Sequence, residues 1–270
     1  MPELPEVETV RRGLLSHCLG QKINQVIIRQ PKLRWPIPAQ LPSLLQHHTI
    51  NQVLRRGKYL LIPFPHGTLL IHLGMSGVLR ILDPATLVTK HDHVDIELST
   101  ITLRFHDPRR FGCILWIEAG KTHPLLDILG PEPLSDDFNT DYLYQSSRHR
   151  ATAVKLFLMN NAVVTGIGNI YCNETLFQAQ IHPTLPAQRI TKAQAKNLVD
   201  ASKSILAAAI ELGGTTIKDF KNSQGKPGYF TQHLQVYGRE GQPCFTCQTP
   251  LQELRLNQRS TIFCPCCQKK

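Results

Sequence analysis

The 270-residue sequence lacks any apolar segment long enough to cross a membrane. Apolar runs such as residues 59–62 and 162–164 fall far below the roughly 20 residues that a spanning helix needs. The first residues also lack the basic region and the apolar stretch of a secretory signal. These absences exclude a membrane-spanning protein and predict a location in the cytoplasm.

Long internal repeats and low-complexity segments are also missing, which excludes fibrous and disordered classes of protein. A chain of this length can bury a full core and is expected to form two domains. Acidic residues are scarce: 20 Asp and Glu stand against 30 Lys and Arg, a formal net charge of +10. Such an excess favours a polyanionic partner such as nucleic acid, although it can also merely solvate a surface.

The eight cysteines are unevenly distributed. Two residues separate Cys244 from Cys247 and two separate Cys264 from Cys267, with sixteen between the pairs. In a cytosolic chain this spacing favours a metal over disulfides and predicts two knuckles that bind one Zn²⁺ on a hairpin. Four protein ligands leave no open position, so the zinc is predicted to be structural. Four cysteines are left without a role: Cys18, Cys113, Cys172 and Cys266.

The first half of the chain predicts a leading helix followed by short strands. Apolar residues recur at helical spacing over residues 5–18, and Gly20 follows where a helix would end. Short β-branched or alternating runs, separated by turn residues, then predict strands of a sandwich or barrel. The expected strands cover residues 23–29, 50–55, 59–64, 68–73, 77–82, 94–98, 100–105 and 113–117.

The second half predicts helices after a region in which proline and glycine break regular structure, residues 120–139. Helices are expected over residues 141–147, 151–160, 169–179 and 191–212. A polar, Gly-rich loop over 218–229 and one strand are expected before the cysteine pairs. The predicted domains are residues 1–130, a linker at 131–150, a helical domain at 151–230 and a metal-binding hairpin at 236–270.

Pro2 and Glu3 predict chemistry at the start of the chain. If Met1 is removed, Pro2 carries a secondary amine with a pKa of roughly 7.7–8, so part of it is an unprotonated nucleophile near neutrality. Such an amine forms a cationic iminium with a sugar aldehyde, and Glu3 could move protons beside it. With Met1 retained, the nitrogen of Pro2 is an amide and cannot attack. The simpler interpretation is that Pro2 and the following glutamates only begin a helix.

Several separated motifs together give a family resemblance. They are PELPEVET at residues 2–9, HLGMSG at 72–77, DPRRFG at 107–112, GIGNIY at 166–171 and the C-terminal cysteine pairs. In this order they resemble bacterial formamidopyrimidine-DNA glycosylase. The resemblance implies an α+β protein with an N-terminal β-sandwich, a leading helix, a helix-two-turns-helix domain and a zinc-finger β-hairpin.

The resemblance also implies a monomeric repair enzyme for damaged double-stranded DNA, which excises 8-oxoguanine and formamidopyrimidines and cleaves the strand by β,δ-elimination. Pro2 is then the nucleophile at the sugar C1′, and Glu3 is the general acid and base. Lys58 matches the lysine that assists β-elimination, and Arg259 matches the hairpin arginine that assists δ-elimination.

The family further implies that three side chains fill the space vacated by the flipped base: Arg109 at the orphaned cytosine, Phe111 as a wedge and Met75 in the gap. Hydrophobicity alone would place Met75 and Phe111 in a core, but their glycine-containing turns predict loop tips. The 218–229 loop resembles the family's lid over the everted base; the alternative is an ordinary surface loop.

Phosphate or backbone contacts are implied for four residues: His91, Arg110, Arg150 and Asn169. His91 could equally be a solvated turn residue, and Asn169 could simply cap a helix, a role compatible with phosphate binding. Asn160 stands where an aspartate is expected, so no charge-based role is carried over to it.

Three rival functions stay open. The sister enzyme for oxidised pyrimidines, endonuclease VIII, is the nearest; residues 4–5 and the three void-filling side chains favour the purine enzyme. A non-catalytic zinc-containing DNA-binding protein would not need Pro2, Glu3 and Lys58 together. A structural thiol or redox protein is a more distant rival.

Overall fold

The computed structural model describes residues 2–215 and 229–270, and these fall into two compact units. Unit 1 contains the chain up to Asp127 together with Leu212–Thr231, and unit 2 contains Ile128–Glu211 and Gln232–Lys270. Residues 131–150, predicted as a linker, belong to unit 2, where Thr140–Ser147 form helix α4. The predicted loop at 218–229 lies outside the described residues except for Tyr229.

Unit 1 begins with helix α1, Leu4–Cys18, one residue earlier than predicted. Glu3 is its N-cap residue, and Glu3 and Glu6 form a capping box that satisfies backbone N–H groups at the helix start. Pro5 lies in the first turn, where a proline costs no helical hydrogen bond. The first turn is therefore fixed in part by Glu3, the glutamate that the sequence marks for chemistry.

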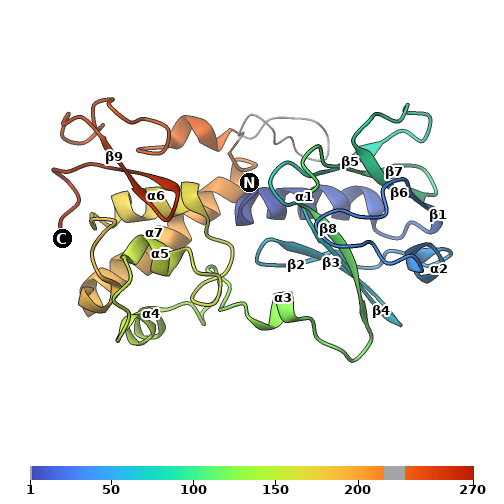
Figure 1. The fold of residues 1–270 in the computed structure, drawn as a ribbon, viewed down its shortest axis with the longest axis horizontal. Helices are drawn as coiled ribbons and strands as arrows, with labels where there is room; N and C mark the ends of the chain where they lie inside the picture. Colours follow the sequence, from blue (N-terminus) through green and yellow to red (C-terminus); the bar gives the residue numbers. More distant parts are fainter. Residues whose placement is uncertain (1, 216–228) are drawn as a thin grey trace. The chain divides into compact units, whose positions relative to one another are not determined.

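Two antiparallel four-stranded sheets follow α1 in unit 1 (Figure 1). One sheet has the order β1-β6-β7-β5, and the other has the order β2-β3-β4-β8. The strands are β1 Ile23–Ile28, β2 Leu54–Arg56, β3 Tyr59–Phe64, β4 Gly67–His72, β5 Val78–Leu82, β6 Asp92–Leu98, β7 Thr102–His106 and β8 Cys113–Glu118. The predicted sandwich is confirmed, but residues 50–53 are not strand, because pairing begins only where Leu54 meets Leu61.

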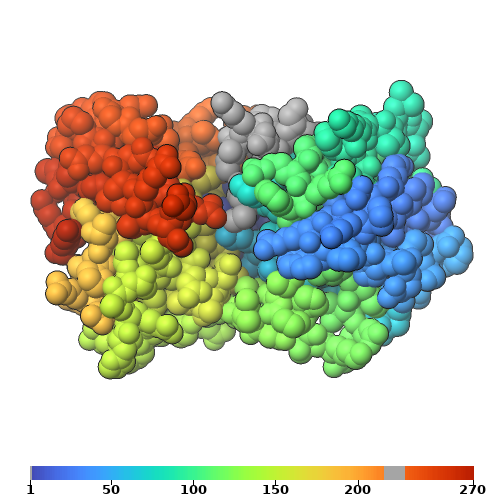
Figure 2. Space-filling view, viewed as in Figure 1, coloured from blue at the N-terminus to red at the C-terminus, as the bar shows by residue number. Residues whose placement is uncertain are grey.

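One hydrophobic core fills the space between the two sheets. Leu60 and Ile71 enter it from one sheet, and Ile96 and Leu103 from the other. Helix α1 contacts β2 and β3 of one sheet and β5 of the other, so its apolar face closes the sandwich. Residues 2–127, coloured blue to green, pack as one body (Figure 2). Each fully buried Leu or Ile contributes about 1.5–3 kcal/mol to this packing.

Two short helices of unit 1 were not predicted: α2, Leu41–Leu45, and α3, Pro124–Asp127. Both have a proline in the first turn, where its missing N–H has no helical partner to lose. The expectation that proline breaks all regular structure between residues 120 and 139 was therefore wrong at Pro124, which begins a helix.

Unit 2 is helical, as predicted. Its elements are α4, α5 Val154–Leu158, α6 Asn169–Gln178, the 3₁₀ helix η1 Ala187–Arg189 and α7 Lys192–Glu211. Helix α7 contacts α4 and α6, and α5 contacts α6. Helix α5 is shorter than the predicted 151–160. The strand expected before the cysteine pairs is absent among the described residues 229–243, which contain the 3₁₀ helix η2, Phe230–His233.

The C-terminal hairpin pairs β9, Gln252–Leu256, with β10, Arg259–Phe263. Its two-residue turn has positive φ at Asn257 and Gln258, the I′ geometry that suits the twist of a hairpin. Two buried side chains hold β10 against the helices. Lys155 Nζ donates to Ser260 O at 2.8 Å and to Thr261 Oγ1 at 2.7 Å, and Asn173 Oδ1 accepts from Ile262 N at 2.9 Å.

Replacing Lys155 by methionine should loosen the hairpin, because Lys155 is fully buried and its two acceptors would lose their charged donor. We expect Lys155→Met to lower the free energy of unfolding by about 2–4 kcal/mol. Amide exchange over residues 252–263 should accelerate. The matched control is Lys196→Met, which removes an exposed lysine that pairs with Asp200. Equal exchange rates in the two variants would contradict the anchoring role.

Candidate functional site

The start of α1 presents Pro2 and Glu3 on a rigid element. Both residues are buried, and Glu3 is only 3% exposed. The backbone N–H of Glu3 donates to Glu6 Oε2 at 2.8 Å. The capping box thus holds Glu3, which follows the predicted nucleophile and carries the carboxylate that the sequence predicts as a general acid and base.

Glu6 also fastens the helix start to a distant segment of unit 1. Its Oε1 accepts from Thr215 N at 2.8 Å and from Thr215 Oγ1 at 2.9 Å. A Cβ on Gly214, whose φ is +80°, would lie 2.8 Å from the same oxygen, so only glycine fits there. This role of Glu6 was missed by sequence reasoning, because a contact across 209 residues leaves no periodic signal.

Lys58, one of the two predicted catalytic cations, lies in the tight turn between β2 and β3. Arg56 pairs with Tyr59, which leaves Gly57 and Lys58 as the two central residues. Gly57 has φ +56°, as the first position of a II′ turn requires. Lys58 is only 7% exposed, so its ammonium group is held in a restricted environment.

A buried ionic cluster ties this turn to α1. Arg55 Nε donates to Glu8 Oε2 at 3.1 Å, and Arg55 Nη1 donates to Gly57 O at 3.0 Å. Arg11 binds both oxygens of the same carboxylate, at 2.7 and 2.9 Å. Burial raises the pKa of Glu8, but the hydrogen bonds and charges of Arg11 and Arg55 outweigh it, so the pKa lies below its ordinary value. Glu8 and Arg55 were both missed by sequence reasoning; only the Glu8–Arg11 spacing gave a signal.

His72, the first residue of the HLGMSG motif, was also missed. Its Nδ1 accepts from Gly74 N at 3.0 Å, and its ring lies 4.8 Å from that of Tyr59. Burial, and then the charges of Lys58 and Arg34, lower the pKa of His72 to about 4. The imidazole is therefore neutral at pH 7 and keeps an Nε2–H group as a donor.

Two loops of unit 1 carry the predicted void-filling side chains. Arg109, Arg110 and Phe111 are exposed, and Met75 is partly buried. Phe111 is 43% exposed, so it is not a core residue, and the Arg109 guanidinium lies 4.9 Å from its ring centre. His91 is partly buried just before β6.

Unit 2 contains the other predicted site residues. Arg150 is exposed, and Arg259 is exposed at the start of β10, beside the hairpin turn. Gly168 is the N-cap of α6, so the simple capping role considered for Asn169 was wrong. Asn169 is the first helical residue, and its buried Oδ1 has no partner among the described residues. Sequence reasoning had no means of detecting this unpaired atom.

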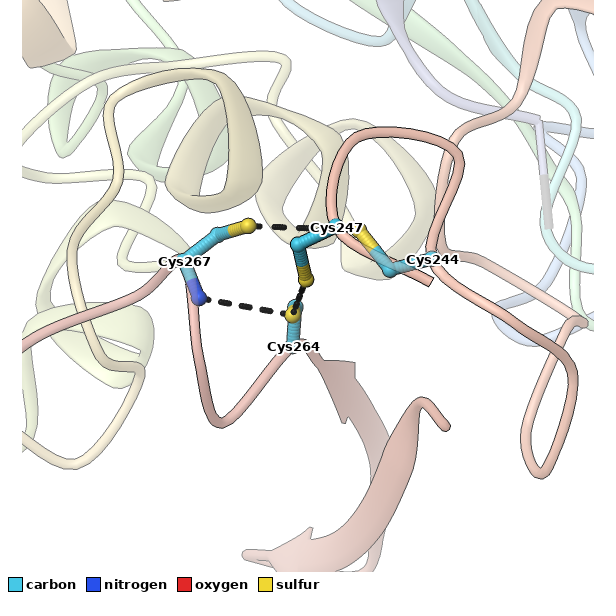
Figure 3. A group of neighbouring side chains, drawn as sticks. All are labelled: Cys244, Cys247, Cys264 and Cys267. Atoms are coloured by element: carbon cyan, nitrogen blue, oxygen red, sulfur yellow. Dashed lines mark hydrogen bonds between the residues drawn. The ribbon is translucent and has the colours of Figure 1, made fainter. Parts of the chain in front are cut away.

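Cys244, Cys247, Cys264 and Cys267 converge at the base of the hairpin, with their sulfur atoms within 4.8 Å of one another (Figure 3). The Sγ atoms of Cys247 and Cys264 are 3.4 Å apart, and those of Cys244 and Cys267 are 4.0 Å apart. We expected the two pairs on facing strands of the hairpin. They lie instead in turns that flank β9 and β10. Four thiols of this spacing fit a tetrahedral metal ion.

The other four cysteines lie outside this group. Cys18, Cys113 and Cys172 are buried, whereas Cys266 is exposed. Burial raises the pKa of Cys18 and of Cys113 to about 12. These two thiols are therefore unreactive at neutral pH.

Two family models match the chain. The formamidopyrimidine-DNA glycosylase N-terminal domain matches residues 1–114, which run through β1–β7 to the start of β8. The formamidopyrimidine-DNA glycosylase helix-two-turns-helix domain matches residues 129–221, which contain α4–α7. The first match thus covers the leading helix and most of the sandwich, and the second covers the helices α4–α7.

Similarity to known proteins extends over the full chain. The formamidopyrimidine-DNA glycosylase of Marinobacter nauticus is 53% identical over 100% of both chains. The crystal structure of Fpg (MutM) from Thermus thermophilus is 40% identical with a TM-score of 0.90, covering 99% of this chain and 98% of that one. A Lactococcus lactis Fpg variant in complex with Fapy-dG-containing DNA is 35% identical with a TM-score of 0.93, covering 100% of both. The chain belongs to the formamidopyrimidine-DNA glycosylase family. Within the described residues, no helix is both long and apolar enough to span a membrane.

The Glu8 cluster predicts a specific pH dependence of stability. A carboxylate with a lowered pKa stabilises the fold above its unfolded pKa of about 4.3, and this contribution is lost as the pH falls through the folded value. Glu8→Gln should therefore be less stable than the wild type at pH 7, by about 1.5–3 kcal/mol for lost hydrogen bonds to a charged group in partly buried pairs. The difference should shrink below pH 4 in urea denaturation. The exposed control, Glu253→Gln, should show neither effect; a Glu8→Gln difference that is constant with pH would refute the ionic role.

Proposed function

We propose that this chain is a base-excision repair enzyme that removes 8-oxoguanine and formamidopyrimidines from duplex DNA and then cleaves the abasic strand. The proposal rests on one observation above all: family membership over the full chain is combined with an intact Pro2-Glu3 start held by the capping box. The Lactococcus relative, solved with Fapy-dG-containing DNA, supports this class of lesion. The partner is damaged double-stranded DNA, bound by a monomer in the cytoplasm.

The first step requires the free amine that removal of Met1 exposes. The lone pair of Pro2 N forms a bond to the sugar C1′, and the C1′–N bond to the damaged base breaks. Opening of the sugar ring converts the adduct to a cationic iminium, with Glu3 supplying the proton to the ring oxygen. The burial and fixed backbone of Glu3 support this assignment, because a general acid must stay within hydrogen-bonding reach of its target.

Strand cleavage follows from the electron demand of the iminium. Loss of a proton from C2′ sends electrons toward C3′ and expels the 3′ phosphate, and a second elimination expels the 5′ phosphate. A cation near each leaving group stabilises the charge that develops. We assign Lys58 to the first elimination and Arg259 to the second. The hydrogen bonds from Arg55 to Glu8 and to Gly57 O support the assignment of Lys58, because they order the turn on which Lys58 lies.

Access to the base requires that the nucleotide leave the stack and that the gap be filled. We assign Met75, Arg109 and Phe111 to the gap, with Arg109 at the orphaned cytosine. The exposure of Arg109 and Phe111 supports this role. Phosphate contacts are assigned to His91, Arg110, Arg150 and Asn169. Asn169 is the first residue of α6, where backbone N–H donors and the helix dipole favour a phosphate group.

The four-cysteine group is proposed to hold one structural Zn²⁺. The burial of Cys244 and Cys264 and the convergence of four sulfur atoms support this ion over a catalytic metal, because no ligand position is left for substrate. When bound, the ion would fix the turns on both sides of the hairpin that carries Arg259.

Borohydride trapping tests the nucleophile. The processed protein should form a covalent adduct with an 8-oxoguanine:cytosine duplex after reduction, and mass spectrometry should place the DNA on the N-terminal peptide at Pro2. The matched control is the same chain with Met1 retained, in which the Pro2 nitrogen is an amide. Faster trapping on thymine glycol would favour the pyrimidine-specific rival. Binding without any adduct, even on abasic DNA, would favour a non-catalytic DNA-binding protein.

Metal removal tests the four-cysteine group. Mass spectrometry of the metal content should find one zinc per chain, and Cys247→Ser should reduce it. We expect the variant to lose amide protection over residues 252–263 and affinity for duplex DNA, while the sandwich of unit 1 keeps its protection. The control is Cys266→Ser, which changes an exposed cysteine outside the group. Full zinc content in Cys247→Ser would overturn the ligand assignment.

A further inference from the structure

Two loops of unit 1 cross between the sheets side by side. The Met75 loop, residues 73–77, leads from β4 to β5, and the wedge loop, residues 107–112, leads from β7 to β8. Strands β4 and β8 are neighbours in one sheet, and β5 and β7 are neighbours in the other. The register pairs His72 with Cys113 and Val78 with His106, so both loops leave the sheets at the same level.

Asp107 is the first residue of the wedge loop and is fully buried. Its Oδ1 accepts from Ser76 Oγ at 2.7 Å, which joins it to the Met75 loop. Its Oδ2 accepts from Gly112 N at 2.8 Å, and Arg109 N donates to both Asp107 Oδ1 and Ser76 Oγ at 3.3 Å. A single carboxylate therefore bridges the residue after Met75 and the backbone on both sides of Phe111.

The backbones of the two loops also approach without a side chain between them. A Cβ on Gly74, whose φ is +66°, would lie 2.4 Å from Gly112 N and 2.4 Å from the carbonyl carbon of Phe111. A Cβ on Gly112 would lie 2.8 Å from His72 O. This second observation is independent of the hydrogen bonds, and it shows that neither loop can move far without displacing the other.

The backbone of Asp107 adds a third connection. Its N–H donates to His91 O at 3.0 Å, and its carbonyl pairs with His93 Nε2 at 2.8 Å. The residue that joins the two loops is thus itself fixed to the start of β6, beside a predicted phosphate contact. A buried carboxylate with this many donors is costly to disturb, because its partners would be left unpaired.

We propose that Asp107 is a positioning residue that couples the Met75 loop to the wedge loop, so that Met75, Arg109 and Phe111 enter the duplex as one rigid body. This inference rests on the proposed function, because it assumes that these side chains fill the gap. Pre-ordered loops lose less conformational freedom on insertion than independent ones. Asp107 touches no reacting atom; it acts through the side chains that it aligns.

The test uses Ser76→Ala, which removes the hydroxyl between the loops and leaves the bond from Gly112 to Asp107. Stopped-flow fluorescence of 2-aminopurine beside the lesion reports insertion. We expect Ser76→Ala to slow insertion by about tenfold, since small misplacements of positioned groups cost one to two orders of magnitude. The effects of Met75→Ala and Phe111→Ala on the insertion rate should be strongly non-additive in the otherwise wild-type protein and nearly additive in the Ser76→Ala background. Asp107→Asn, whose amide keeps one acceptor oxygen but replaces the other with an NH₂ donor, should do the same if it folds.

Controls separate this inference from the proposed function. Ser76→Thr keeps the hydroxyl and should restore insertion and coupling. Borohydride trapping on a single-stranded abasic oligonucleotide, which has no gap to fill, should be unchanged in Ser76→Ala. Wild-type insertion and unchanged coupling in a folded Ser76→Ala protein would overturn the role of Asp107. Absence of trapping by the wild-type protein itself would instead show that the proposed function fails.

Discussion

Buried carboxylates at the start of α1 are the constraint on which unit 1 depends. Glu3, Glu6 and Glu8 all lie below the surface within two helical turns, and a buried carboxylate is stable only when donors surround it. Glu6 finds donors at Glu3 and Thr215, and Glu8 finds them at Arg11 and Arg55. Three segments that are far apart in the sequence are thereby held at one helix terminus, which is where the chemistry of this family is proposed to begin.

The same principle recurs in unit 2 with different groups. Glu174 accepts three backbone N–H groups from residues 235–237, and Lys155 and Asn173 hold β10. These polar side chains fix irregular backbone that no sheet or helix would stabilise. The hairpin is thus attached to the helices by specific bonds as well as by apolar packing, and its four cysteines, which could hold a metal ion, lie in a small apolar cluster.

Sequence reasoning predicted what is periodic or closely spaced. The strands, the long helices and the cysteine pairs each leave a local pattern, and the structure contains them within a few residues. It failed where a contact joins distant residues, as between Glu6 and Thr215, or where a residue acts through burial, as His72 and Asp107 do. Local composition was also misleading at Pro124, because proline is compatible with the first turn of a helix although it breaks later ones.

The distribution of cysteines has a consequence for oxidative chemistry. Because burial raises the pKa of Cys18 and of Cys113 to about 12, little of either thiol is ionised at pH 7, so oxidants and alkylating agents react with them slowly. Cys172 is likewise enclosed. Cys18 and Cys113 in unit 1 and Cys172 in unit 2 are therefore protected from oxidants, whereas Cys266 in the C-terminal hairpin is exposed and would be oxidised before them.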